Sequence, residues 1–504
     1  MSKNKYLLNS SSGIFQVVVN SLLFVVTIPV LLRHLGTELY GVFALITTAS
    51  AVGVLVNFGF NLSLIRFIGE QGKGADSDRD IIISLLFSFS LITIFTIGLI
   101  YFNGIFLHDV LFLSNKYINE STIYLFNAIV LSNIFLFVGQ ILSAVIDSQK
   151  KIYISNLLQV TYVLMSRIGI IVAVMGGGSF IEIGNVYIGS TLIWFMFLSV
   201  FFLRIWKFTS LSGFSKGLLK RMFKHISYGS KIYLSSLSGY FYEPFVKILI
   251  GRYIGVMEVG VFDIAFRMKT MLWSIIERAM YPIVPLIAEY DGSKNAELIE
   301  WLSKKIFLLS IPVVCSLYFV IDPLIVLWLG KNNELIIITT RILLSVYLLT
   351  ASGIPIYVYL MIKNHPEKTF IIQMFNAILG GVFFFLLVPH FGYIGGVIAF
   401  VSAVICTQIQ LIWWQNKYVS STPISTFSDL LKTMYLSGVI IIFNAVVALT
   451  ISNTPVKLFA YIIIDGSLLS LLSIRLSIVT VKDLEKIFGT TAFFKSSYVN
   501  INKQ

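Results

Sequence analysis

The chain alternates between long apolar segments and short polar ones, a pattern that predicts membrane-spanning helices. Each apolar segment is close to the roughly 20 residues that a helix needs to cross a bilayer. The fourteen segments are residues 13–32, 42–65, 81–102, 121–146, 153–175, 183–203, 232–251, 259–288, 306–329, 336–361, 369–388, 393–415, 433–452 and 456–480. Only 12% of the 504 residues are charged, against about 25% in soluble proteins. We therefore predict an all-α polytopic membrane protein with about 14 transmembrane helices.

The basic residues orient these helices. Lysine and arginine concentrate in cytoplasmic loops of membrane proteins, and most of the 37 basic residues fall into alternate loops if the N-terminus is cytoplasmic. The loops on the other side hold Arg33, Lys116, Arg252, Lys331 and Lys457. The sequence thus predicts a multi-pass membrane protein with cytoplasmic N- and C-termini.

Two short motifs recur at a fixed distance and predict an internal repeat. Arg33-His34-Leu35-Gly36, four residues and Gly41-Val42-Phe43 match Arg252-Tyr253-Ile254-Gly255, four residues and Gly260-Val261-Phe262 after 219 residues. Because the shift covers six predicted helices, an even number, both halves keep one orientation, which makes this a parallel repeat. We predict two six-helix parallel-repeat bundles around a central cavity, with two additional C-terminal helices. The predicted divisions are 1–203 for the first bundle, 204–231 for a basic cytoplasmic linker, 232–417 for the second bundle and 418–504 for the last two helices and tail.

The helix predicted over 259–288 carries charges that lipid would not tolerate. At 100° per residue, its polar side chains fall in one stripe about 80° wide. The stripe consists of Asp263, Arg267, Thr270, Ser274, Arg278 and Tyr281. An arginine near mid-bilayer costs roughly 2.5–3.5 kcal/mol on insertion scales. The stripe should therefore face a protein interior or a water-filled cavity.

Basic residues outnumber acidic ones inside the predicted membrane segments. Glu243 with Lys247, and Asp263 with Arg267, are four residues apart and can pair locally. The remaining cationic excess suits an anion, particularly a phosphate group. Five residues are the predicted substrate-binding set of a cationic cavity: Arg267, Arg278, Lys247, Arg341 and Arg167. The structural alternative is that the ion pairs only hold helices together.

Uncharged polar residues also form one-sided stripes, as Gln16 and Asn20 do in the first predicted helix and Asn57 does in the second. Together with Glu243 and Asp263 they are candidates for polar cavity-lining or coupling groups. Hydrogen bonding between helices is the simpler interpretation for most uncharged positions.

The spacing of cysteine and histidine predicts neither a disulfide framework nor a metal site. Cys315 and Cys406 lie far apart in apolar segments. The histidines are scattered at positions 34, 108, 225, 365 and 390. We expect no cofactor. The net charge of +13 is explained by cytoplasmic loops, so we predict no nucleic-acid partner.

Three stretches resemble the polysaccharide-exporting branch of the multidrug/oligosaccharidyl-lipid/polysaccharide exporter superfamily, and most of all O-antigen-type lipid-linked oligosaccharide flippases. They are Pro29 with Arg33 to Gly41, Gly260 to Pro285, and Asp322-Pro323-Leu324 with Trp328-Leu329-Gly330. The resemblance implies a transporter of a bacterial cytoplasmic (inner) membrane. It also implies alternating access without chemistry, so no catalytic residues and no enzyme activity are expected. It implies an undecaprenyl-pyrophosphate-linked oligosaccharide as substrate, for O-antigen, lipopolysaccharide or capsule biosynthesis, with a polysaccharide polymerase and a chain-length regulator as partners.

Three alternatives stay open at this stage. A cation-coupled drug antiporter of the same superfamily would use Glu243 or Asp263 for coupling, although the first predicted helix has Gln16 and Asn20 where drug exporters often carry an acid. A polytopic glycan polymerase or glycosyltransferase usually needs a large external loop or a carboxylate pair, and neither is apparent. A scaffold for glycan assembly would not explain charges within membrane helices.

Overall fold

A computed structural model describes residues 3–50, 59–208, 218–280, 287, 289–290, 292–330, 332–363, 365–419 and 427–476. These residues form helices and connecting turns, without a strand. By its internal contacts the chain divides into two units, Met1–Gly260 and Val261–Gln504. Residues 51–58 of the second predicted helix, which include Asn57, lie outside the described part.

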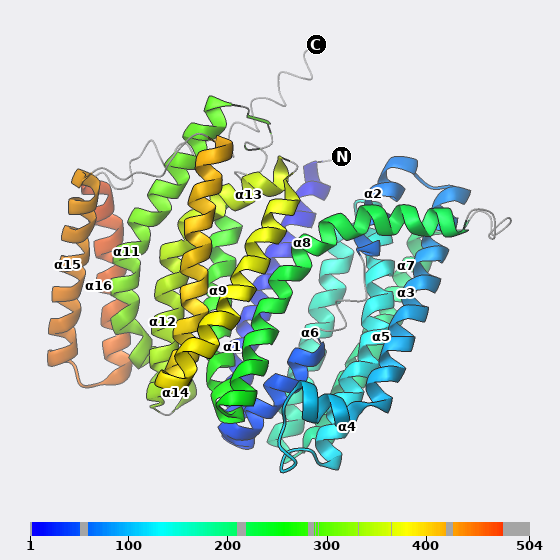
Figure 1. The fold of residues 1–504 in the computed structure, drawn as a ribbon, viewed down its shortest axis with the longest axis horizontal. Helices are drawn as coiled ribbons and strands as arrows, with labels where there is room; N and C mark the ends of the chain where they lie inside the picture. Colours follow the sequence, from blue (N-terminus) through cyan, green and yellow to red (C-terminus); the bar gives the residue numbers. More distant parts are fainter. Residues whose placement is uncertain are drawn as a thin grey trace. The chain divides into compact units, whose positions relative to one another are not determined.

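Helices α1 to α8 and a π-helical turn lie in the described part of the first unit (Figure 1). The elements are α1 (Lys3–Ser50), α2 (Phe60–Gln71), α3 (Ala75–Tyr101), α4 (Asn103–Ile105), a π-helical turn (Phe106–Val110), α5 (Glu120–Ser148), α6 (Ile152–Met175), α7 (Phe180–Ile205) and α8 (Leu218–Tyr253). Helix α5 packs against α2, α3 and α7, and α6 packs against α1 and α7. Apolar side chains of α2, α3, α5, α6 and α7 form its core, which includes the buried Trp194 and Trp206.

The second unit begins within α9 (Val256–Met280). Its further elements are α11 (Ser293–Leu329), α12 (Glu334–Thr350), a 3-10 turn (Ala351–Gly353), α13 (Ile354–Ile362), α14 (Pro366–Val419), α15 (Phe427–Thr450) and α16 (Thr454–Arg475). Helix α11 contacts α12, α15 and α16, so the last two helices belong to the packed body of this unit. Leu308, Leu436 and Ile440 are buried where they meet.

Ten helices of the described part are long and apolar enough to cross a membrane. Two of these, α1 and α14, are interrupted by non-helical glycines, Gly36 and Gly392, and each includes parts of two predicted spans. Helices α8 and α9 are more strongly charged and are not among the ten. The all-helical membrane fold is confirmed, and the count of about 14 stays a prediction.

The repeated glycine motifs occupy corresponding places. Gly36 has φ 76° and separates the two helical parts of α1, and Gly255 separates α8 from α9. A methyl group added to Gly41 would lie 1.9 Å from the carbonyl oxygen of Val256, and one on Gly260 would lie 3.0 Å from that of Thr37.

The same shift of 219 residues converts Thr37 into Val256 and Gly41 into Gly260. Gly41 thus lies close to Val256, the counterpart of Thr37, and Gly260 lies close to Thr37 itself. The repeat stays a prediction. The superposition of whole bundles, and the boundaries at 203, 231 and 417, stay predictions.

Candidate functional site

The two predicted ion pairs of the membrane helices are confirmed. Arg267 Nε lies 2.6 Å from Asp263 Oδ2 on α9, where Asp263 is fully buried and the arginine side chain keeps 29% of its exposure. Lys247 pairs with Glu243 on α8, and here the lysine is buried at 2% exposure while the glutamate is more open. Because each charge has a partner one helical turn away, burying it costs less.

Arg341 has a partner that the sequence analysis did not identify. Its guanidinium lies 2.8 Å from Asp322 on α11 and donates two hydrogen bonds to the carbonyl oxygen of Tyr318. The same guanidinium stacks 4.1 Å above the Tyr318 ring. A helix-to-helix pair 19 positions apart has no periodic signal in the sequence, so spacing alone could not reveal it.

Less can be said of the other two predicted basic residues, Arg167 and Arg278. Arg167 lies on α6 and is partly buried, whereas the side chain of Arg278 lies outside the described residues. Arg167 and Lys247 belong to the first unit, and Arg267 and Arg341 belong to the second. A single cationic cavity formed by all five therefore stays a prediction.

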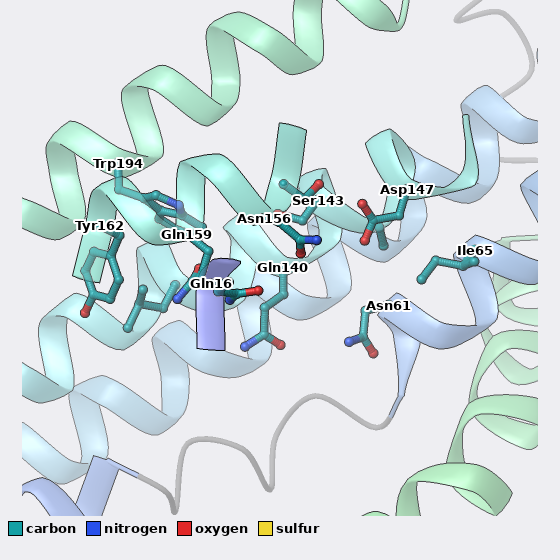
Figure 2. Close-up of a pocket in the computed structure, with 13 residues that line it drawn as sticks. Gln16, Asn61, Ile65, Gln140, Ser143, Asp147, Asn156, Gln159, Tyr162 and Trp194 are labelled. Atoms are coloured by element: carbon teal, nitrogen blue, oxygen red, sulfur yellow. The ribbon is translucent and has the colours of Figure 1, made fainter. Parts of the chain in front are cut away.

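The first unit contains a polar cavity of about 370 Å³ (Figure 2). It lies among α1, α2, α5, α6 and α7, and most of its 13 lining residues are polar. They are Gln16, Asn61, Ile65, Leu136, Gln140, Ser143, Ala144, Asp147, Ser155, Asn156, Gln159, Tyr162 and Trp194. Asn20 lies on the same helix as Gln16 but is not among them.

Carboxamides dominate the middle of this cavity. Figure 2 shows Gln16, Gln140, Asn156 and Gln159 between an aromatic end, formed by Tyr162 and Trp194, and an opposite end with Asp147 and Asn61. The two aromatic rings are 5.8 Å apart between centroids. None of the 13 lining residues is basic, so the cavity has donors, acceptors and one carboxylate but no lysine, arginine or histidine to bind a phosphate.

Several polar atoms of the lining residues are buried without a hydrogen bond to any described part of the protein. They are Asp147 Oδ1, Ser155 Oγ and Trp194 Nε1. Buried polar atoms are nearly always paired, and leaving one unpaired costs roughly 1–3 kcal/mol. The lining of the cavity is therefore less completely hydrogen-bonded than most protein interiors.

The sequence contains a pattern that indicates this cavity, namely polar residues on one face of several helices. Gln16 was predicted as a cavity residue, but Gln140, Ser143 and Asp147 were not, although they recur on one face of α5 at intervals of three and four residues. Asn156 and Gln159 repeat the pattern on α6. Single-helix patterns could not show that these faces meet.

Comparison with known proteins assigns the chain to a family. The profile of the family described as "Polysaccharide biosynthesis protein" matches residues 7–291, more than half of the chain. The chain belongs to this polysaccharide biosynthesis family. No curated protein matches it significantly.

Solved structures similar to this family member are membrane transporters of one superfamily. The lipid II flippase MurJ in an inward closed conformation has a TM-score of 0.63 at 15% identity, covering 93% of this chain and 99% of its own. An inward-facing multidrug resistance MATE family transporter of the MOP superfamily has a TM-score of 0.65 at 18% identity, covering 80% and 94%. A MOP superfamily transporter from Pyrococcus furiosus, described as having a binding pocket of reversed polarity, has a TM-score of 0.52 at 18% identity, covering 82% and 94%. At these identities the similarity establishes the MOP-type transporter fold, and the three similar proteins are described as a flippase and two transporters.

Proposed function

We propose that this protein is a flippase that moves a polyprenyl-pyrophosphate-linked oligosaccharide from the cytoplasmic to the outer leaflet of a bacterial inner membrane, by alternating access. The observation that carries the proposal is the carboxamide-lined cavity within a polysaccharide-family transporter. Amide groups both donate and accept hydrogen bonds, as sugar hydroxyls do. Aromatic rings such as Tyr162 and Trp194 add an apolar surface for the carbon-bound face of a sugar ring.

In this proposal the two parts of the substrate headgroup bind in different places. The cavity of the first unit takes sugar, because its lining residues supply no positive charge. The pyrophosphate binds to the partly exposed basic side chains, of which Arg267 and Arg341 have the planar guanidinium that matches phosphate oxygens. The polyprenyl chain stays in lipid. The product supplies O-antigen or capsule assembly, where a polymerase and a chain-length regulator would act next.

One observation favours a cation-coupled drug antiporter as the second candidate. Asp147 is a carboxylate in a cavity without basic lining residues, and its neighbour Ser155 in the same lining is uncharged. Such a carboxylate can bind a proton or a cationic drug.

The test is a transport assay on the purified protein in vesicles. A fluorescent polyprenyl-pyrophosphate disaccharide placed in one leaflet should become accessible from the other leaflet, and it should do so faster than in protein-free vesicles. Proton-driven uptake of a cationic dye is measured in parallel, with Asp147→Asn as the variant. Dye uptake that requires Asp147, without movement of the lipid-linked sugar, would establish the antiporter and refute the flippase.

A further inference from the structure

The first turns of α8 have two distinct faces. Lys220, Phe223, Lys224 and Ser227 are exposed and recur at intervals of three and four residues, so they share one side of the helix. Phe223 keeps 62% of its exposure. The opposite side packs on the first unit through the partly buried Met222 and Ile226. We call residues 218–229 the α8 arm.

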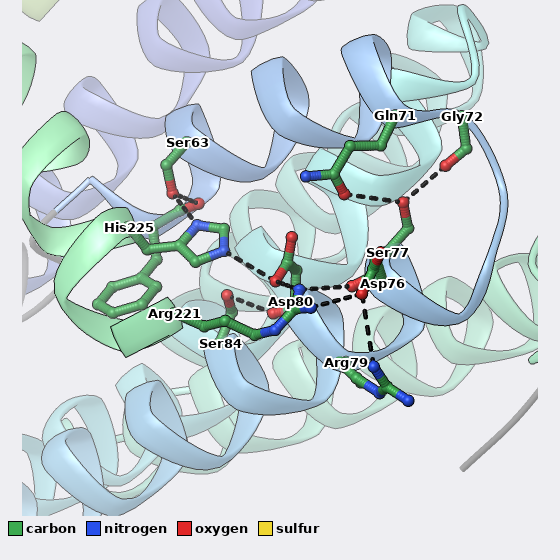
Figure 3. Close-up of polar contacts among 11 residues, drawn as sticks. Ser63, Gln71, Gly72, Asp76, Ser77, Arg79, Asp80, Ser84, Arg221 and His225 are labelled. Carbon is green, nitrogen blue, oxygen red and sulfur yellow. Dashed lines mark hydrogen bonds and ion pairs between the residues drawn. The ribbon is translucent and has the colours of Figure 1, made fainter. Parts of the chain in front are cut away.

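Charged and polar contacts fix the inner side of the α8 arm to α2 and α3 (Figure 3). Arg221 Nη1 donates to Asp80 Oδ1 at 2.9 Å, and the same guanidinium pairs with Asp76. His225 is fully buried, and its Nδ1 lies 2.7 Å from Ser63 Oγ. Burial acts to lower the pKa of Arg221, but the neighbouring Asp80 and Asp76 outweigh it and raise the pKa. The Arg221 guanidinium therefore stays charged at neutral pH.

The α8 arm lies across the ends of the upright helices of the first unit rather than along them (Figure 1). The same helix continues, with a change of direction, into the predicted span 232–251. An arm joined in this way to a spanning segment lies at the level where bilayer headgroups begin. On the predicted topology this is the cytoplasmic side, where anionic lipids attract basic segments.

We propose that the outer face of the α8 arm binds anionic lipid headgroups, with Lys220 and Lys224 against phosphates and Phe223 inserted at the boundary of the acyl chains. A face with two lysines around an exposed aromatic ring is complementary to an anionic interface. Lys224 Nζ lies 4.1 Å above the Phe67 ring, which holds this ammonium at the edge of the arm. This interaction is separate from substrate binding and does not depend on the proposed transport activity.

The test measures where the arm lies in a bilayer. Ser227→Cys, in a protein carrying Cys315→Ser and Cys406→Ser, is labelled with an environment-sensitive fluorophore and placed in phosphatidylcholine vesicles with or without phosphatidylglycerol. Spin-labelled lipids should quench the fluorophore more strongly when phosphatidylglycerol is present. The double variant K220Q/K224Q should weaken this dependence on anionic lipid about tenfold, and F223S should reduce quenching in both kinds of vesicle.

The control removes the same charge elsewhere. K294Q/K432Q, on the exposed start of α11 and on α15, should leave the quenching unchanged. Equal quenching with and without phosphatidylglycerol would refute the proposal, and so would an equal effect of the control variant. Added salt should reduce the phosphatidylglycerol effect, because these charges are exposed.

Discussion

Two clusters of polar side chains within the apolar helices are built differently. In the first unit, carboxamides surround a cavity in which Asp147 Oδ1, Ser155 Oγ and Trp194 Nε1 have no partner among described residues. In the second unit, Asp465 on α16 accepts hydrogen bonds from Asn444 at 3.0 and 3.1 Å and from Ser316.

The Asp465 cluster joins three helices and leaves one unpartnered atom, Asn444 Oδ1, in the described structure. Both carboxylate oxygens of Asp465 accept hydrogen bonds from neighbouring helices. The lining of the cavity is less completely hydrogen-bonded, and it surrounds a volume of about 370 Å³. Similar residue types thus serve helix association in one place and favour ligand binding in the other. Polar composition alone does not distinguish the two roles.

The largest effect is expected at the Asp465 cluster. Asp465→Ala removes the acceptor that joins α11, α15 and α16 and leaves Asn444 and Ser316 without it, at a cost of about 2 kcal/mol. Thermal unfolding in detergent should shift to lower temperature, and Asp465→Asn should shift it less. Asp109→Ala, at an exposed carboxylate, is the control and should have little effect. An unchanged unfolding temperature for Asp465→Ala would contradict the role in helix association.

Whether a polar contact can be predicted from the sequence depends on how far apart its two residues are along the chain. Lys247 and Arg267 pair with residues four positions away, so the helical period predicted both contacts. Asp465 and Ser316 are 149 positions apart, and Arg221 and Asp80 are 141 apart, so no local pattern reveals them. The glycine motifs differ from these pairs, because the same residue pattern occurs twice and can be recognised in the sequence over a distance of 219 residues.

The polar residues that line the cavity could not be assigned to it from the sequence either. Charged residues are the clearest sign of a buried site in a membrane sequence, because a charge in lipid is costly. Most uncharged stripes are predicted to form hydrogen bonds between helices. That interpretation fits Ser352, which accepts from Gln408 at 3.0 Å. It does not fit the faces of α5 and α6 that line the cavity. Which neighbour each face meets is a property of the tertiary fold.

The role of Arg267 can be tested as either an ion-pair partner that stabilises the fold or a residue that binds substrate. If it only pairs with Asp263, the double variant D263N/R267Q should regain the stability that Arg267→Ala loses and should transport normally. If it binds pyrophosphate, as proposed, transport should fall at least tenfold in both variants and less in Arg267→Lys, which keeps the charge without the bidentate geometry. Transport of the fluorescent lipid-linked sugar and thermal unfolding are measured on the same preparations. Normal transport by the double variant would remove Arg267 from the site.

A substitution in the cavity lining should reduce transport rather than stability. Gln159→Ala removes one carboxamide from the lining, and we expect a loss of transport of about tenfold with an unfolding temperature close to that of the unaltered protein. Asn115→Ala, at an exposed loop carboxamide of the same unit, is the matched control and should change neither. A variant that unfolds earlier and transports normally would place Gln159 with the helix-joining residues instead.

The smallest effect is expected at the third polar cluster, where the α8 arm meets α3. Arg221 keeps 25% of its exposure, and His225 Nε2 stays 3.7 Å from the buried Asp80 carboxylate when the arginine is replaced, so the cost is smaller than that of a buried charge left without any partner. Arg221→Gln should therefore lower the unfolding temperature only slightly, while the buried Asp80 loses its cationic partner and holds the arm less firmly. Hydrogen exchange of residues 218–229 should become faster in this variant, with α5 unchanged. Lys294→Gln, at an exposed position on α11, is the control and should leave exchange as it was. Equal protection in both variants would show that Ser63, His225 and the apolar contacts hold the arm without the arginine.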